Sequence, residues 1–158
     1  MNAQLIEFDQ NRTLMLIIAD LCTAWGISDC EQYSLQFNDS TNAYITEKNR
    51  NEIKNGSVLR LTHSPSRKAQ DILEKLKFGS PESRFITFER LVKLSTDYTF
   101  ALEFINKQGL QFVIDSIEKD EISNTDGFGF ALESFVELMN HGIISWYLNL
   151  SLMSLLSD

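Results

Sequence analysis

The sequence predicts a small α+β unit followed by an all-α unit. Residues 4–62 switch between the alternating apolar pattern of strands and a single helical stripe, whereas the residues after Ser64 keep the helical period. An Asn55-Gly56 pair, typical of a tight turn, precedes the last alternating run of the first part. With 158 residues, 43% of them hydrophobic and 23% charged, the chain can bury one core or two small ones.

The first part opens with a short apolar run, Gln4–Phe8, which we interpret as a strand followed by a polar turn. From Thr13 the apolar residues lie three or four positions apart, which predicts a helix, and Gly26 predicts its end. The apolar stripe of this helix consists of Leu14, Ile17, Ile18, Leu21 and Trp25.

Three more strands are expected in the first part. Tyr33–Phe37 alternates apolar and polar residues, Ala43–Ile45 is a short apolar run, and Val58–Thr62 follows the Asn-Gly turn. The resulting order, strand, helix and three strands, is that of a ubiquitin-like roll without its first strand. We assign this incomplete ubiquitin-like unit to residues 1–62.

The second part, residues 65–158, begins at the Ser64-Pro65-Ser66 boundary and predicts helices only. A polar loop around residues 123–126 precedes the last of them. The apolar stripes are Ala69, Ile72, Leu73 and Leu76; Phe85, Phe88, Leu91, Val92 and Leu94; Phe100, Leu102, Phe104 and Ile105; Phe112, Val113, Ile114 and Ile117; and Phe130, Leu132, Phe135, Val136, Leu138 and Met139.

Two helix corners in the second part share one pattern: a helix end, a glycine, then apolar residues. The two glycines, Gly109 and Gly142, lie 33 residues apart, close to the period of stacked helical repeats. The pattern therefore predicts the start of an armadillo-like solenoid.

The composition disfavours several classes of partner. The net charge is −8, and both parts are acidic, with five Lys/Arg against eight Asp/Glu in residues 1–62 and nine against fourteen in residues 63–158. We therefore expect neither nucleic acid nor an anionic membrane surface as a partner. Four polar residues interrupt the apolar stretch Ile143–Leu156, so we expect no membrane span, and the N-terminus does not resemble a signal peptide.

The residues that could carry chemistry do not form a recognisable catalytic or metal site. His63 and His141 have no nucleophile, acidic partner or metal ligand at a recognisable spacing. Gly127-Phe128-Gly129 is a lone glycine pair and no phosphate-binding loop. Cys22 and Cys30 fit reduced thiols better than a disulfide or zinc site. The sequence therefore predicts a non-enzyme without cofactor or metal.

Recognition of a partner is the better supported function. The polar insert Glu47–Lys54 lies between two apolar runs and is either recognition scaffold or a merely solvated loop. Trp25 continues the helical stripe, so we expect it to be buried. Ile27 lies off that stripe and is the better candidate for a partner contact.

Several stretches resemble the N-terminal part of the engulfment and cell motility (ELMO) family. The longest are Tyr44–Leu61 and Phe135–Trp146, and the resemblance covers about residues 4–146; the tail 147–158 is not similar. Shorter matching strings are Phe8-Asp9-Gln10, Ala24-Trp25, Tyr33-Ser34-Leu35-Gln36 and Glu103-Phe104-Ile105-Asn106.

The resemblance implies a cytoplasmic adaptor that a GTPase recruits to the plasma membrane. In this family a Ras-binding-type domain takes the GTP-bound form of RhoG, a Rho-family GTPase, and armadillo-like repeats follow. Later regions, absent from this sequence, engage a Dock-family exchange factor for Rac in engulfment and cell migration. An edge strand is the usual GTPase contact in such domains. The expected partner-binding residues are Gln4, Leu5, Ile6, Glu7 and Phe8, with Ile27 and Lys48 as further candidates.

Two other interpretations remain open from the sequence. The chain is either a helical-repeat interaction module with a vestigial N-terminal part, or a product that does not fold.

Overall fold

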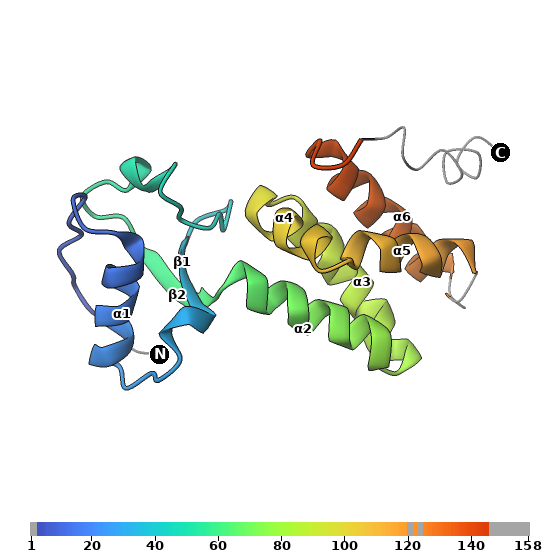
Figure 1. The fold of residues 1–158 in the computed structure, drawn as a ribbon, viewed down its shortest axis with the longest axis horizontal. Coiled ribbons are helices and arrows are strands. Elements are labelled where there is room, and N and C mark those ends of the chain that lie inside the picture. The colour runs from blue at the N-terminus through green and yellow to red at the C-terminus, as the bar shows by residue number, and fades with distance from the viewer. Residues whose placement is uncertain (1–2, 120–121, 123–124, 146–158) are drawn as a thin grey trace. The chain divides into compact units, whose positions relative to one another are not determined.

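A computed structural model describes residues 3–119, 122 and 125–145 of the chain. The chain separates into two compact units, Met1–Ser64 and Pro65–Asp158. In Figure 1, the first unit holds one α-helix and a small sheet, and the described part of the second holds helices. The predicted fold class, α+β followed by all-α, is confirmed.

The helix of the first unit, α1, spans Leu14–Ala24 and ends as the sequence predicts. Gly26 adopts a left-handed φ of 68°, which residues with a Cβ rarely adopt. The backbone N–H of Ile27 donates to the carbonyl of Cys22 at 2.8 Å, and that of Gly26 donates to Thr23 at 3.2 Å. These paired bonds satisfy carbonyls that the last turn of a helix leaves open.

The sheet consists of β1, Tyr33–Phe37, and β2, Leu59–His63, paired antiparallel with Leu35 opposite Leu61. A short 3-10 helix, η1, spans Cys30–Gln32 and leads into β1. The strand predicted at Ala43–Ile45 is reduced to one isolated bridge between Gln36 and Tyr44. The chain turns at residues 47–49, which leaves no room for a longer ladder.

One face of this sheet packs against α1 and forms the core of the first unit. The apolar side chains of β1 and β2 that face the helix alternate with polar ones on the opposite face. The buried core residues are Leu14, Ile17, Leu21, Leu35 and Ile45, with Ile6, Phe8, Ile18, Phe37, Ile53, Leu59 and Leu61 partly buried against them.

The prediction of a strand at Gln4–Phe8 is wrong. These residues are extended along α1 but have no regular secondary structure, and no backbone hydrogen bond joins them to another described segment. An extended segment becomes a strand only where a neighbouring ladder accepts its N–H and C=O groups. Ala43–Ile45 already covers the outer side of β1, and Gln4–Phe8 does not lie on β2.

Side chains, above all that of Arg50, hold this N-terminal segment in place. Arg50 begins a 3-10 helix, η2, which spans Arg50–Glu52, and its side chain is only 10% exposed. Its guanidinium donates to the carbonyl of Asp9 at 3.1 Å, to Oε1 of Gln10 at 3.2 Å and to Oε2 of Glu47 at 2.8 Å. Gln10 in turn donates from Nε2 to the carbonyl of Arg50 at 3.0 Å.

The second unit has five described helices: α2, Pro65–Phe78; α3, Pro81–Ser95; α4, Tyr98–Asn106; α5, Gly109–Glu118; and α6, Thr125–Asn140. Side-chain caps explain two of the starts. Ser80 accepts the N–H of Ser83 at 3.2 Å before α3, and Asp97 accepts the N–H of Phe100 at 2.9 Å before α4. The predicted polar loop ends where α6 begins at Thr125, and residues 123–124 lie outside the described ranges.

The predicted apolar stripes of these helices converge on one core. The largest fully buried side chains in this core are three phenylalanines and several aliphatic residues, among them Phe100, Phe104, Phe135, Ile72, Leu76, Leu91, Leu138 and Met139. Val136 from the last stripe is 37% exposed instead, because it lies off the buried face of α6.

The two corners that look alike in sequence differ in structure. At the second corner Gly142 itself takes the left-handed conformation, with φ 68°. At the first corner Gln108 takes it, with φ 66°, and Gly109 is already helical. A Cβ on Gly109 would lie 2.5 Å from the ring of Phe104, so glycine is needed there for close packing and not for its conformational freedom.

None of the helices in the described ranges combines the length and the apolar character that crossing a bilayer requires. From residue 146 onward, the apolar stretch Ile143–Leu156 lies outside those ranges.

Replacing Gly109 by Ala should lower the free energy of unfolding by about 2 kcal/mol, because the new methyl group would press into the buried ring of Phe104. Gly129, within α6, is the matched control, since a Cβ there meets nothing within 4 Å. Gly129→Ala should raise stability by about 0.5 to 1 kcal/mol through the better helix propensity of alanine. Urea denaturation of both variants measures the two effects. Equal effects in both would contradict the packing argument.

Replacing Arg50 by Met should lower the free energy of unfolding by about 2 kcal/mol, because it leaves the acceptors on Asp9, Gln10 and Glu47 without their donor. Arg12→Met is the control. Arg12 pairs with Asp20 at 2.7 Å, but both side chains are well exposed, so its loss should cost under about 0.5 kcal/mol. Thermal melts followed by circular dichroism compare the two, and a harmless Arg50→Met would show that the network does not hold the segment.

Candidate partner-binding surface

The predicted contact residues 4–8 form an extended strip along α1, called the N-terminal strip below. At one end, Gln4 accepts a hydrogen bond from the indole N–H of Trp25 at 3.0 Å, beside the C-terminal end of the helix. At the other end, the ring centroid of Phe8 lies 5.3 Å from Cζ of Arg50. Figure 1 shows this segment in dark blue, running antiparallel to α1.

The strip has an inner and an outer side. Ile6 and Phe8 are partly buried against the core, whereas Gln4, Leu5 and Glu7 are exposed. Leu5 is 99% exposed, so its apolar side chain is almost completely hydrated in the unbound chain. Covering a leucine is favourable by about 1.5 to 3 kcal/mol. The outer side therefore offers one large apolar group next to a carboxylate.

The remaining two predicted contacts lie at opposite ends of the strip. Ile27 is partly buried and follows the turn that ends α1, close to the contact between Gln4 and Trp25. Lys48 is exposed and directly follows Glu47 in the loop at the start of the helix. Five of the seven predicted residues thus form the strip itself, and the other two lie towards its two ends. Trp25, which we expected to be buried, is only partly so.

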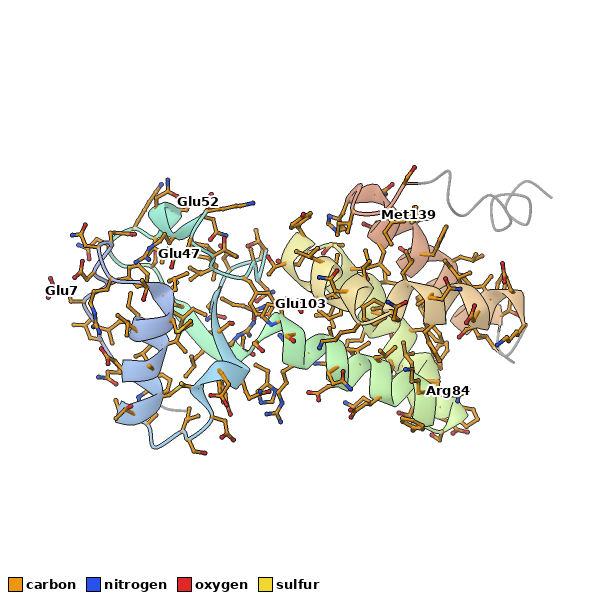
Figure 2. All side chains as sticks on the ribbon, in the orientation of Figure 1. Glu7, Glu47, Glu52, Arg84, Glu103 and Met139 are labelled. Atoms are coloured by element: carbon orange, nitrogen blue, oxygen red, sulfur yellow. The ribbon has the colours of Figure 1, made fainter. Side chains whose placement is uncertain are left out.

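Glu47 links Arg50 to the start of α1. Its Oε1 accepts the backbone N–H of Leu14 at 3.0 Å, while Oε2 accepts from Arg50. The hydrogen bond from Leu14, followed by that from Arg50, lowers the pKa of the Glu47 carboxyl below its ordinary value. The carboxylate is therefore charged at neutral pH, and its stabilising effect is lost only as the pH falls through that lowered pKa. Figure 2 shows Glu47 beside the start of α1 and Glu7 on the strip.

Sequence reasoning missed the residues that organise this surface. Arg50 and Glu47 looked like members of a solvated or recognition loop. Thr13 is itself a favoured N-cap residue, so no sequence signal indicated that its side chain leaves the start of α1 uncapped and that Glu47 accepts the N–H of Leu14 instead. Sequence reasoning also passed over Met15 and Leu16 of α1, which are 78% and 52% exposed. Both residues lie off the buried stripe of the helix, and this spacing in the sequence could have predicted that their side chains are exposed.

The histidines and cysteines have structural surroundings. The ring of His63 packs edge-on against Tyr33, and His141 lies with Nε2 2.6 Å from the backbone carbonyl of Ser95. Burial raises the pKa of the Cys22 thiol, which disfavours the reactive thiolate. Within the described ranges, no group of three or more His, Cys, Asp or Glu side chains is placed to hold a metal ion.

Comparison with known families matches two models to the chain. One, described as the ELMO protein N-terminal Ras-binding domain, matches residues 1–64. The other, described as the ELMO armadillo-like helical domain, matches residues 99–153. The second match continues past Trp146, so the predicted end of the resemblance at that residue is wrong.

Comparison with curated proteins gives the same family. The chain is 43% identical over 148 residues to Engulfment and cell motility protein 2 of Mus musculus, covering 92% of this chain and 20% of that protein. It is 42% identical over 154 residues to protein 1 of Homo sapiens and 42% identical over 143 residues to protein 3 of Homo sapiens, each covering 90% of this chain. It spans 21% and 20% of the lengths of those two relatives. The chain belongs to the ELMO family.

Proposed function

We propose that the first unit binds a GTP-loaded Rho-family GTPase and that the chain is a non-catalytic adaptor. One observation carries this proposal: the Ras-binding domain model matches residues 1–64, the region that contains the N-terminal strip. The exposed Leu5, the neighbouring Glu7 and the absence of hydrogen bonds from the strip's backbone to other described segments support a partner contact at this place.

An extended strip can bind a GTPase by adding a strand to it. Ras-type GTPases order their switch segments around the γ-phosphate, so an edge that pairs with an ordered switch discriminates between the GTP and GDP states. The backbone groups of residues 5 and 7 would supply main-chain hydrogen bonds, and Leu5 an apolar anchor. Ile27 and Lys48 would contact the partner at the two ends of the strip.

The proposed GTPase is RhoG, and the proposed pathway is Dock-dependent Rac activation in engulfment and cell migration. This part of the proposal rests on family membership. The chain spans about a fifth of the length of its curated relatives, so the partners and pathway of the whole proteins are carried over to it as a proposal. We assign residues 1–62 to the GTPase-binding unit and residues 65–158 to the armadillo-like repeats. The adaptor would act in the cytoplasm and reach the plasma membrane through the GTPase.

Replacing Leu5 by Asp should weaken binding to RhoG at least about tenfold, because an anchor that is buried on binding becomes a desolvated charge. Val58→Asp is the matched control: Val58 belongs to the same unit, is 64% exposed and lies outside the strip. It should retain wild-type affinity within about twofold. Isothermal calorimetry with RhoG loaded with a non-hydrolysable GTP analogue measures both variants. GDP-loaded RhoG should not bind.

If Leu5→Asp and wild type bound the loaded GTPase equally well, the strip would be removed from the binding site. If both GTP- and GDP-loaded forms bound equally well, the effector-type interaction would be wrong.

The second candidate function is a helical-repeat module that binds its partner through the second unit. The observation in its favour is an exposed phenylalanine: Phe78, at the end of α2, is 83% exposed and borders a shallow pocket of about 400 Å³. Asp71, Glu74, Lys75 and Gly79 complete the lining.

Phe78→Asp discriminates between the two functions. A loss of RhoG binding in this variant, with binding retained in Leu5→Asp, would favour the helical module. Binding retained in Phe78→Asp and lost in Leu5→Asp favours the N-terminal strip. Ile86→Asp on α3, where Ile86 is 61% exposed, is the control for a charge added elsewhere on the same unit.

A further inference from the structure

The side of α1 that faces away from the core of the first unit carries exposed apolar residues. Met15 is 78% exposed and Leu16 is 52% exposed, and Ala19 lies about one turn further along the same side. Residues three or four positions apart share a face of a helix, so these side chains form one continuous stripe, called the outer stripe below. The apolar stripe on the opposite side of the helix is the one that enters the core.

The polar groups beside the outer stripe already have partners within the unit. The hydroxyl of Thr23 donates to the carbonyl of Ala19 at 2.9 Å, which leaves the methyl group of this exposed threonine to extend the stripe by one turn. Oδ2 of Asp20 accepts from Nη1 of Arg12 at 2.7 Å. Covering the stripe with another surface would therefore leave no hydroxyl or carboxylate of these residues without a hydrogen bond.

Such a composition is unusual for a helix with one free side. Asp20 is the single charged residue among the 11 of α1. By comparison, α2 of the second unit combines its buried apolar stripe with six charged residues, Arg67, Lys68, Asp71, Glu74, Lys75 and Lys77. A helix with apolar residues on both sides is typical of one that is covered on both sides, so the outer stripe indicates a contact with a further surface.

The charges that border the outer stripe suit an antiparallel copy of the same helix. Leu16 lies four residues after Arg12 and four residues before Asp20, so opposite charges stand on either side of it along the helix. A second α1 running in the opposite direction would bring its Asp20 to Arg12 and its Arg12 to Asp20. A parallel copy would instead set like charges together, which is unfavourable.

A membrane surface suits the outer stripe less well than a second copy. Helices that lie on membranes usually carry Lys and Arg on the side that faces the lipid headgroups. α1 contains neither residue type, and the net charge of the chain is −8. Anionic headgroups would therefore repel the chain.

We propose that the outer stripe of α1 packs antiparallel against the outer stripe of a second copy of this chain. With a two-fold axis between Leu16 and Ala19, each Leu16 would pack over the partner's Ala19, a large side chain against a small one. Met15 would cover one flank of this contact. One pair of short helices buries a small area, so the dimer would be weak and concentration-dependent. The contact uses no residue of the N-terminal strip and is independent of the proposed GTPase binding.

Leu16→Glu tests the contact, because it places a charge at its centre while the side chain stays exposed in the single chain. Val58→Glu is the matched control: Val58 belongs to the same unit, is 64% exposed and lies outside α1. Sedimentation equilibrium of the full chain should show wild type moving from the 18.1 kDa monomer towards twice that mass as its concentration rises. Leu16→Glu should weaken this association at least about tenfold, and Val58→Glu by less than about twofold.

Charge reversal tests the antiparallel orientation. Arg12→Glu and Asp20→Lys should each weaken self-association about threefold or more, because like charges would then meet at both ends of the contact. Mixing the two variants in equal amounts should restore association, since every pair between an Arg12→Glu chain and an Asp20→Lys chain is of opposite sign. Both variants lose the internal pair between residues 12 and 20, so a mere loss of folding would not be rescued by mixing.

Three results would overturn the proposal. The first is a wild-type chain that keeps the monomer mass up to about 1 mM. The second is a Leu16→Glu variant that associates as tightly as Val58→Glu, since the contact would then lie on another surface. The third is a pair of charge variants that each associate as tightly as wild type, or whose mixture is no stronger than its components, since the helices would then not meet in the antiparallel orientation.

Discussion

The first unit depends on one buried guanidinium. Arg50 binds the carbonyl of Asp9, the amide of Gln10 and the carboxylate of Glu47, three groups that lie on both sides of α1 in the sequence. Because Glu47 also accepts the N–H of Leu14, the same network fixes the start of the helix. A buried charge is tolerated only where several partners satisfy it, so these groups must come together whenever the unit folds. The N-terminal strip therefore has a defined position without being part of the sheet.

This arrangement explains how a small unit can fold and still leave the backbone of the proposed binding strip available. A strip that paired with β2 would have used up its backbone groups, whereas a strip held by side chains keeps them free for a partner. The stability comes from Arg50, Phe8 and Ile6 on the inner side, and the proposed recognition from Leu5 and Glu7 on the outer side. Alternation along an extended segment separates the two roles. The second unit depends on a different constraint, the close approach of Gly109 to Phe104.

The regular elements could be predicted from the sequence because their patterns reflect burial on one face. The stripe from Leu14 to Leu21, the alternation in Tyr33–Phe37 and the stripes of α2 to α6 all correspond to buried faces. The failures concern long-range contacts. The apolar run at Gln4–Phe8 has the composition of a strand, but a strand needs a neighbour, and no local pattern reveals whether one exists. Gln108 and Gly109 show the same limit, because the need for glycine comes from a ring five residues away.

The candidate surface could be predicted only in part. Five of the seven expected contacts form one strip, with Ile27 and Lys48 towards its two ends. Arg50 and Glu47, which organise this region, looked like ordinary loop charges, since their partners are separated from them by 33 to 41 residues. Hydrogen exchange of the full chain, with and without GTP-loaded RhoG, tests the central claim most directly. The account predicts fast exchange at residues 5–8 in the free chain, slow exchange at Phe37 and Ile45, and protection of residues 5–8 on binding. Slow exchange at residues 5–8 in the free chain, or no protection on binding, would contradict it.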